Sequence, residues 1–172
     1  LVAKNTERMM GLTDQVLSYY TYDDKETLKV MKFEVSVFLK SMLQSFDYMF
    51  RQKELTLNIE IPDGIKAYCD REKIERILFN VLSNAAKYTM EGGVVTVKAG
   101  VADDNLIISV ADTGVGISPD KMRSIFDRFD RGDMEGGNLP GFGIGLNYAL
   151  HLAVLHKGLL TVAPNLPKGS VF

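Results

Sequence analysis

The sequence predicts an α/β (α+β) two-layer sandwich, in which a mixed, largely antiparallel sheet carries its helices on one face. Apolar and polar residues alternate over several short stretches, which is typical of half-buried strands. Between these stretches, apolar residues recur every three or four positions, which is typical of amphipathic helices. Strands are expected over residues 28–33, 55–61, 94–101, 106–111, 159–163 and 170–172, and helices over 36–52, 71–88 and 143–157. Because the strands come largely in antiparallel-looking pairs, one sheet with helices on one face is the most economical arrangement.

Composition and charge narrow the class of protein. The 172 residues are 46% hydrophobic and 24% charged with a net charge of −2, which fits one globular core and gives no reason to expect nucleic acid as a partner. The one cysteine, Cys69, cannot form an internal disulfide, so a reduced cytosolic setting is expected. No apolar run approaches the ~20 residues of a membrane span. Since the chain opens at Leu1 and stops at Phe172 inside an apparent strand, we expect a piece of a longer protein.

The first residues carry a helical heptad pattern. Val2, Met9 and Val16 are spaced seven residues apart, as in the seam of a coiled coil, and the polar stretch 21–27 then breaks the pattern. A helix that packs on its own domain explains this periodicity equally well. The interpretation that we adopt is a separate helical element over residues 1–22 and a second domain over residues 23–172.

The first half of the second domain has clear element boundaries. The helix over 36–52 is expected to turn Val37, Met42 and Phe46 inward. The strand that follows ends before Pro62, because proline cannot donate to a sheet ladder. Asp70 has the side chain of a helix N-cap, so the next helix is expected to start directly after it.

In the second half, turn residues separate the elements. Residues 102–105 are expected to join two strands as a hairpin. A short helix is expected from Pro119 with Ser118 as its cap, and residues 128–139, rich in glycine and charge, are expected to form a long mobile loop. The last helix is expected to end with cations and a glycine C-cap at Gly158.

A polar stripe follows one edge of the helix over 71–88. Asn80, Asn84, Lys87 and Tyr88 lie along this edge, since positions three and four apart stack on one side of a helix. They offer amide oxygens, a cation and an aromatic face, which are the groups that a metal–polyphosphate–base ligand requires. A solvated helix edge has the same composition, so the stripe alone does not decide between the two.

Two glycine-containing segments add to this stripe. Asp112 ends an apolar strand and is followed by Gly114 and Gly116, which would let the backbone approach a flat ligand closely. Residues 141–146 place three glycines before a helix, where backbone N–H groups and the positive end of the helix dipole favour phosphate. A tight turn with an Asp cap and a flexible loop are the simpler alternatives for each segment taken alone.

The polar stripe, the Asp-Gly turn and the glycine loop follow one another along the chain, and together they strongly resemble the ATP-binding domain of bacterial sensor histidine kinases. That domain belongs to an ATPase superfamily shared with DNA gyrase and the heat-shock chaperones. The resemblance extends from about Leu28 to Phe172. It includes the N box over 80–89, the first glycine box over 112–117, the F box over 126–129 and the second glycine box over 141–146. Residues 1–22 resemble the second half of the family's dimerisation and phosphoacceptor hairpin, without its first helix and phosphorylatable histidine.

The resemblance implies a site for ATP and Mg²⁺. Asn84 would hold Mg²⁺, while Asn80, Lys87 and Arg131 would lie at the phosphates as the catalytic residues. Asp112 would accept a hydrogen bond from the adenine amino group. The other positions implied to bind the nucleotide are Tyr88, Gly114, Gly116, Ile117, Phe129, Gly141, Gly143, Ile144, Gly145, Leu146 and Ser170.

The function implied by the resemblance is that of a protein-histidine kinase. Its γ-phosphate would go from ATP to a histidine of the dimerisation domain and then to an aspartate of a response regulator receiver domain. The full-length protein is expected to be a homodimer, anchored in the inner membrane with this domain in the cytoplasm. His151 and His156 are expected to be a surface residue and a helix cap, not phosphoacceptors.

The alternative function is an ATP-hydrolysing or nucleotide-sensing module of the gyrase and chaperone kind. Those relatives are expected to carry a glutamate at the position of Asn80, because a carboxylate can activate water and an amide cannot. Asn80 therefore favours phosphate transfer over hydrolysis.

Overall fold

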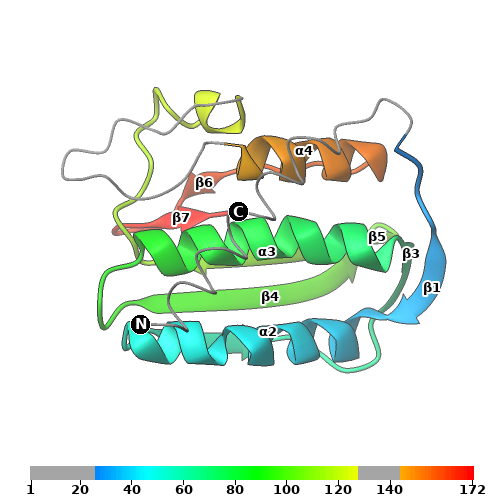
Figure 1. Cartoon of the computed structure of the whole chain (residues 1–172), viewed down its shortest axis with the longest axis horizontal. Helices are drawn as coiled ribbons and strands as arrows, with labels where there is room; N and C mark the ends of the chain where they lie inside the picture. The colour runs from blue at the N-terminus through cyan, green and yellow to red at the C-terminus, as the bar shows by residue number, and fades with distance from the viewer. Residues whose placement is uncertain (1–25, 128–143) are drawn as a thin grey trace, which may run out of the picture.

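Within residues 26–127 and 144–172, which the computed structural model describes, a five-stranded sheet carries three α-helices on one face (Figure 1). The strands are β1 (Met31–Glu34), β2 (Thr56–Glu60), β3 (Lys66–Cys69), β4 (Val94–Ala102), β5 (Asn105–Asp112), β6 (Ala163–Pro164) and β7 (Ser170–Val171). The helices are α2 (Val35–Gln52), α3 (Arg71–Tyr88), α4 (Gly145–Leu155) and the short 3₁₀ helix η1 (Ser124–Phe126). The predicted two-layer α/β sandwich is confirmed.

The sheet is mixed but mostly antiparallel, as the sequence predicted. Its strand order is β2-β4-β5-β7-β6, and only the β2–β4 pair is parallel. A long β4–β5 hairpin forms its centre, and it is closed by Asp103 and Asp104 with φ values of 49° and 60°. Two positive φ values in a two-residue loop are typical of the hairpin turns that match strand twist. The turn predicted over residues 102–105 is therefore confirmed.

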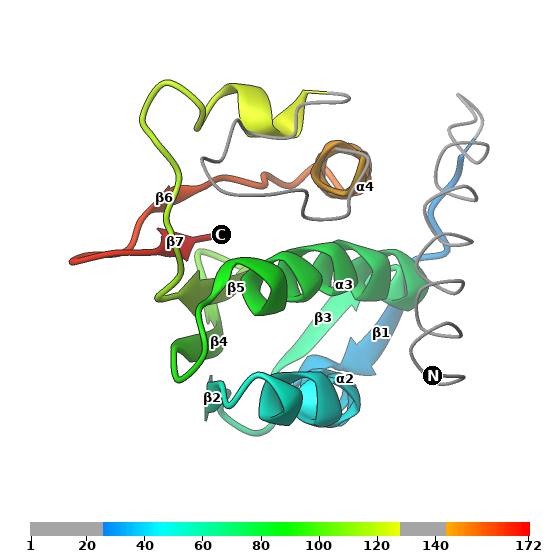
Figure 2. The ribbon, with the colours of Figure 1, turned by 60° about the vertical axis from the view of Figure 1, so that its left-hand side comes forward.

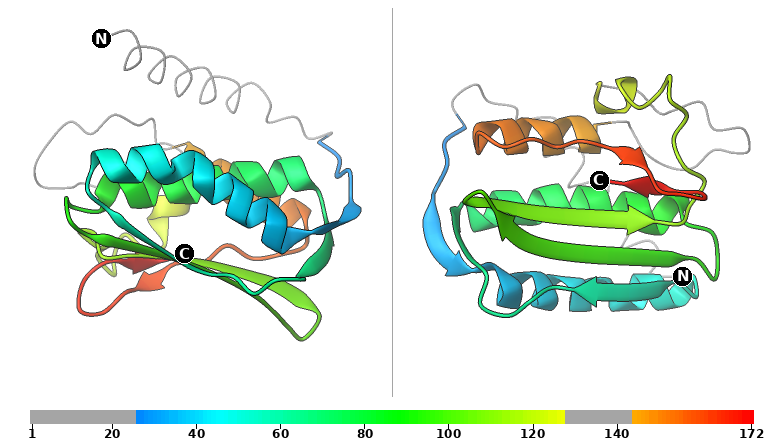
Figure 3. Two further views of the ribbon diagram at one scale, coloured as in Figure 1. Left: turned by 90° about the horizontal axis from the view of Figure 1, so that it is seen from below. Right: turned by 180° about the vertical axis from the view of Figure 1, so that it is seen from behind.

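The three α-helices lie side by side on the sheet, with α3 between α2 and α4 (Figure 2). Seen from below and from behind, the strands form a separate layer that leaves the helices on one side only (Figure 3). Apolar side chains from both layers meet in one core, whose most buried members include Val35, Leu43, Leu82, Val95, Val97 and Val110. The central helix α3 consequently has one face in this core and one edge beside α4.

Charged side chains fix both ends of α3. At its start, the Asp70 carboxylate accepts the Lys73 backbone N–H at 3.2 Å, which confirms the predicted N-cap. At its end, the Lys53 ammonium donates to the carbonyl oxygens of Ala86 and Lys87, at 2.7 and 3.0 Å. The last carbonyls of a helix have no partner within the helix, so a cation there is favourable.

The buried face of α2 differs from the prediction. Val37 was expected to point inward, but its side chain is 60% exposed, whereas Met42 and Phe46 are buried as expected. The helix begins at Val35, and its core face follows the spacing of Val35, Leu39, Met42 and Phe46. Val37 lies about 200° around the helix from Val35, because each residue advances by about 100°. The prediction for Val37 was wrong because a single apolar residue does not fix the rotation of a helix.

Other local predictions also need correction. β3 was not predicted, because it and its antiparallel partner β1 are four residues each and mostly exposed, so no buried face imposes alternation. The strand expected over 159–163 is limited to β6, and the helix expected from Pro119 is a series of turns followed by η1.

At the end of α4, the left-handed residue is Lys157 with a φ of 58°, not the predicted Gly158. The Gly158 N–H reaches back to the Ala153 carbonyl at 2.9 Å and the Lys157 N–H to that of Val154 at 2.8 Å, which is the Schellman pattern of a helix end. The glycine therefore stands one position later than the backbone geometry requires.

Two predicted regions lie outside the described residues, namely the helix over 1–22 with its domain boundary and the loop over 128–139. No helix within the described part of the chain is long and apolar enough to cross a membrane.

The orientation of α2 gives a stability prediction. Leu39→Ala should lower the free energy of unfolding by about 2–5 kcal/mol, because it opens a cavity at a side chain that is 2% exposed. Val37→Ala on the same helix should change it by less than ~0.5 kcal/mol, because that side chain faces solvent. Urea unfolding of both variants measures the difference, and equal losses would contradict the observed rotation of α2.

Candidate functional site

The predicted site residues of the N box and the first glycine box converge where three elements meet. Asn80, Asn84, Lys87 and Tyr88 lie on the second half of α3, Asp112 ends β5, and Gly145 begins α4. A Cβ atom at Gly145 would collide with the Asn80 side-chain oxygen, so the first turn of α4 lies directly against α3. Segments that are far apart in the sequence are thus brought together around the polar edge of α3.

Asp112 is a buried carboxylate at the end of the central hairpin. Only 4% of the residue is exposed, and its Oδ1 accepts the Gly114 backbone N–H at 2.8 Å. Burial raises the pKa of Asp112 above its ordinary value of 3.8, although the backbone N–H groups of Gly114 and Ser170 oppose this shift. A carboxylate in such a place gains from a further hydrogen-bond donor, because water no longer supplies one.

Two positions that the sequence analysis did not single out hold Asp112 in place. The Asn165 side-chain amide donates to the Asp112 carbonyl at 2.8 Å, and a Cβ atom at Gly169 would collide with that same carbonyl oxygen. The β5–β7 pairing sets Asp112 opposite Ser170, another of the residues expected to bind the nucleotide. Neither Asn165 nor Gly169 belongs to a periodic pattern, so the sequence carried no signal for them.

The first glycine box is fastened to the end of α3. Gly114 approaches the Tyr88 carbonyl so closely that a Cβ atom would collide with it, and the Val115 N–H donates to that carbonyl at 3.2 Å. Gly114 was expected to let a flat ligand approach the backbone, but in the structure the group that it admits is the backbone at the end of α3. Gly116 has a φ of 77°, where a residue with a Cβ atom would be strained.

A depression of about 350 Å³ lies beside this box. It is lined by Val115, Gly116, Ile117 and Ser118 on one side and by residues 164–169 on the other. Gly116 and Ile117, which were expected to line a nucleotide base, therefore do border a hollow at the Asp112 end of the site.

Lys87 and Tyr88 form a neighbouring pair on the edge of α3. The Lys87 ammonium donates to the Tyr88 hydroxyl at 2.9 Å and lies 4.6 Å from the centre of its ring. Such a contact adds a cation–π attraction to the hydrogen bond. The two side chains predicted to contact phosphate and base thus contact each other in this structure.

The two asparagines differ in their contacts. Asn80 donates its side-chain amide to the Arg76 carbonyl at 2.9 Å, which leaves its oxygen turned to Gly145. The Asn84 side chain is half-buried and has no hydrogen-bond partner among residues 26–127 and 144–172. An amide oxygen on a helix edge suits a hard cation such as Mg²⁺, so Asn84 fits the predicted metal role.

The second glycine box is described only in its last part. Ile144 is the N-cap residue of α4, Gly145 is its first residue, and Leu146 packs against the core. The remaining predicted site residues, Phe129, Arg131, Gly141 and Gly143, lie outside the described residues.

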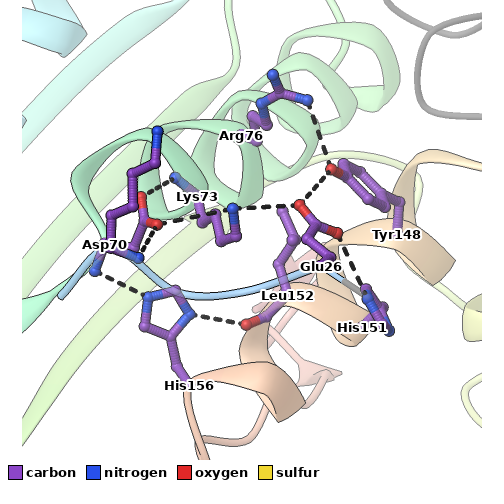
Figure 4. A network of polar contacts seen from close by, with 9 residues as sticks. Glu26, Asp70, Lys73, Arg76, Tyr148, His151, Leu152 and His156 are labelled. Atoms are coloured by element: carbon purple, nitrogen blue, oxygen red, sulfur yellow. Dashed lines mark hydrogen bonds and ion pairs between the residues drawn. The ribbon is translucent and has the colours of Figure 1, made fainter. Parts of the chain in front are cut away.

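The environment of the two histidines is shown in Figure 4. His156 accepts the Asp70 backbone N–H on Nε2 at 3.1 Å and contacts the Leu152 carbonyl through Nδ1 at 2.8 Å. This confirms a structural position at the end of α4. The expectation that His151 is a surface residue was wrong, because its side chain is 24% exposed and its Nε2 lies 3.6 Å from the Glu26 carboxylate.

The raised pKa of Asp112 gives a prediction for stability against pH. A carboxyl whose folded pKa lies above 3.8 stabilises the fold fully below that pH and loses this contribution as the pH rises through the raised value. Between pH 3.8 and the raised pKa, the free energy of unfolding of the wild type should therefore fall relative to that of Asp112→Asn, which does not titrate. Above the raised pKa, the difference between the two proteins should stay constant. Urea unfolding at a series of pH values measures this, and a wild type that gains on the variant with rising pH would contradict it.

Comparisons with known proteins bear on what such a site does. Residues 69–172 match the family described as histidine kinase-, DNA gyrase B-, and HSP90-like ATPase. Histidine kinase P4 of Formosa agariphila is 30% identical over 180 residues, which cover 100% of this chain and 13% of that protein. Sensor histidine kinase WalK of Bacillus subtilis is 32% identical over 164 residues, covering 92% of this chain and 27% of that protein. The chain thus spans only a small part of these relatives.

Solved structures agree on the fold. Full-length ShkA in complex with AMPPNP superposes with a TM-score of 0.83 at 24% identity, covering 98% of this chain and 35% of that one. The nucleotide-free catalytic domain of histidine kinase ThkA superposes with a TM-score of 0.74 at 21% identity, covering 84% of this chain and 92% of that one. The relatives described here are histidine kinases, and the chain belongs to the histidine kinase-, DNA gyrase B-, and HSP90-like ATPase family.

Proposed function

We propose that this chain is the catalytic domain of a sensor histidine kinase, which binds ATP with Mg²⁺ and presents the γ-phosphate to a histidine on a dimerisation helix. The observation that carries the proposal is the buried Asp112 carboxylate, because it ends β5 directly before the glycine box that borders a hollow, within the part of the chain that matches the ATPase family. The family match and the names of the relatives support the same activity.

At the adenine end, Asp112 would accept a hydrogen bond from the exocyclic amino group. The N–H groups of Gly114 and Ser170 already hold this carboxylate in place, so it needs little reorganisation to receive a ligand. Gly116 and Ile117 would line the base.

At the phosphate end, the residues on the edge of α3 would do most of the work. Lys87 would leave the Tyr88 hydroxyl to contact phosphate, and Tyr88 would then be available to cover the adenine. Asn84 would hold Mg²⁺, which supplies charge neutralisation when it is bound. The first turn of α4, with Ile144, Gly145 and Leu146, would direct its positive end at the phosphates. The same proposal includes Phe129, Arg131, Gly141 and Gly143, on the strength of their motifs.

Transfer is favoured over hydrolysis by Asn80. Its amide nitrogen is committed to the Arg76 carbonyl, and an amide oxygen is too weak a base to take a proton from water. The rival function as an ATP-hydrolysing module would therefore lack a general base at this position.

The phosphate would pass on to a response regulator receiver domain, and the complete protein would act as a homodimer. A solved structure of ThkA is in complex with response regulator protein TrrA, which supports the same type of partner for this chain. Anchoring of the complete protein in the inner membrane stays a prediction.

The first test of this function is nucleotide affinity. Asp112→Asn should weaken the binding of a non-hydrolysable ATP analogue by about 1–3 kcal/mol, because the charged acceptor for the adenine amino group is lost. Isothermal titration calorimetry with Mg²⁺ measures the change. Asp104→Asn, in the exposed hairpin turn, is the matched control and should bind like the wild type.

The metal role is checked in the same titration. Omission of Mg²⁺ should weaken binding by the wild type, while Asn84→Ala should bind with nearly the same affinity with and without Mg²⁺. Unchanged affinity of Asp112→Asn would remove the adenine assignment, and a full Mg²⁺ dependence in Asn84→Ala would remove the metal assignment.

A second prediction concerns the phosphate acceptor. Incubated with radiolabelled ATP and Mg²⁺, this chain should take up no stoichiometric acid-labile label, because both ring nitrogens of His156 are engaged and His151 packs on Glu26. A protein that supplies a phosphoacceptor hairpin histidine in trans should become labelled. Acid-labile label on the chain alone that disappears in His151→Ala or His156→Ala would overturn this assignment.

A further inference from the structure

Glu26 inserts a carboxylate between the segment that leads into β1, residues 26–30, and the two helices of the site (Figure 4). Its side chain is 15% exposed. One oxygen lies 3.2 Å from the Lys73 ammonium on α3 and accepts the Tyr148 hydroxyl on α4 at 3.4 Å. The other lies 3.6 Å from Nε2 of His151 on α4. One side chain therefore joins the leading segment to both helices.

The surroundings of Glu26 make this junction specific. The Tyr148 residue is 1% exposed, and the Arg76 guanidinium also donates to its hydroxyl at 3.4 Å. Burial and the nearby Glu26 charge both raise the pKa of Tyr148, so the phenol keeps its proton and remains a donor. A buried carboxylate is unfavourable without such partners, so the position of Glu26 is tied to Lys73, Arg76 and Tyr148.

A second contact fixes the other end of the leading segment. The Lys29 N–H donates to the Asp70 carboxylate at 2.7 Å, and the same carboxylate lies 3.6 Å from the Lys73 ammonium. Asp70 in turn donates its N–H to His156 at the end of α4. The leading segment is thus attached near both ends of α4, through Tyr148 and through Asp70 and His156.

The Glu26 cluster is connected to the candidate nucleotide site through residues that contact Asn80 directly. Tyr148 follows Gly145 by three residues on α4, and Gly145 lies against the Asn80 side chain. Arg76, which donates to Tyr148, accepts the Asn80 amide on its carbonyl. Asn80 is therefore contacted from two sides by residues that the Glu26 cluster positions, and a displacement of the leading segment would alter both contacts.

We propose that Glu26 is a positioning residue for the nucleotide site, which transmits the position of the leading segment to α4 and Asn80. This inference rests on the proposed ATP site. A chain that enters the domain through residues 26–30 can then change nucleotide affinity without touching the nucleotide, as a coupling between two sites requires.

The test compares binding with stability in variants of the whole chain. Glu26→Gln, which removes the charge, and Tyr148→Phe, which removes only the hydroxyl, should each weaken AMPPNP binding by about fivefold or more at a temperature where both are folded. Glu60→Gln is the matched control, because it breaks a surface ion pair with Lys98 in which both side chains are about half exposed. It should bind like the wild type.

The coupling must also act in the opposite direction. Saturation with AMPPNP should slow hydrogen exchange of the Lys29 amide in the wild type, and this protection should be smaller in Tyr148→Phe. A purely structural role would lower the unfolding temperature of the variants and leave the affinity of the folded protein unchanged.

The outcomes separate the two proposals. A wild type that does not bind AMPPNP overturns the proposed function. A wild type that binds, with unchanged affinity in Glu26→Gln and Tyr148→Phe, overturns this inference alone. If Glu26→Gln does not fold, Tyr148→Phe decides the question.

Discussion

The central helix α3 must bury one face in the core and keep the polar side chains along its edge accessible to a ligand. The arrangement of the elements around it depends on this constraint. Its core face packs on the β4–β5 hairpin, while Asn80, Asn84 and Lys87 remain on a partly exposed edge, where Asn80 meets the first residue of α4. The rotation of the helix is set by its buried face, which includes Leu78, Val81 and Leu82, and the Asp70 carboxylate and the Lys53 ammonium satisfy backbone groups at its two ends. Burial of this face holds the polar stripe on the edge of the helix, because the side chains of a rigid helix keep fixed angles to one another.

Stability and function have opposite requirements at Asp112. Burial makes its charged form unfavourable in the folded protein, which is the reason for its raised pKa. Within the described residues, the backbone N–H groups of Gly114 and Ser170 lower this cost, and a donor from a ligand would relieve a further part of it. Buried charged groups with shifted pKa values, which destabilise the folded protein, are concentrated at functional sites.

Polar contacts between distant segments give the helical layer its second role. Glu26, Asp70 and Tyr148 connect the chain that leads into the domain with α3 and α4 (Figure 4). Asp70 and Tyr148 are buried and the Glu26 side chain is 15% exposed, so these polar contacts specify the geometry more narrowly than apolar packing alone would achieve. The same helix α4 then presents Gly145 to Asn80. Gly145 at the start of α4, which borders the candidate site, and Tyr148, which contacts Glu26, therefore belong to the same rigid helix.

Elements with strong periodicity and residues with strong local chemistry could be predicted from the sequence alone. The hairpin, the Asp70 cap and the motif residues on α3 and β5 follow from local spacing and turn chemistry, which act over a few residues. The tertiary structure alone decided the rotation of α2 that exposes Val37, the pairing of β1 with β3, and the packing of His151 on Glu26. It also decided that Gly114 accommodates the Tyr88 carbonyl and that Asn165 holds Asp112. These contacts join residues far apart in the chain, and no local pattern encodes which distant partner a side chain will meet.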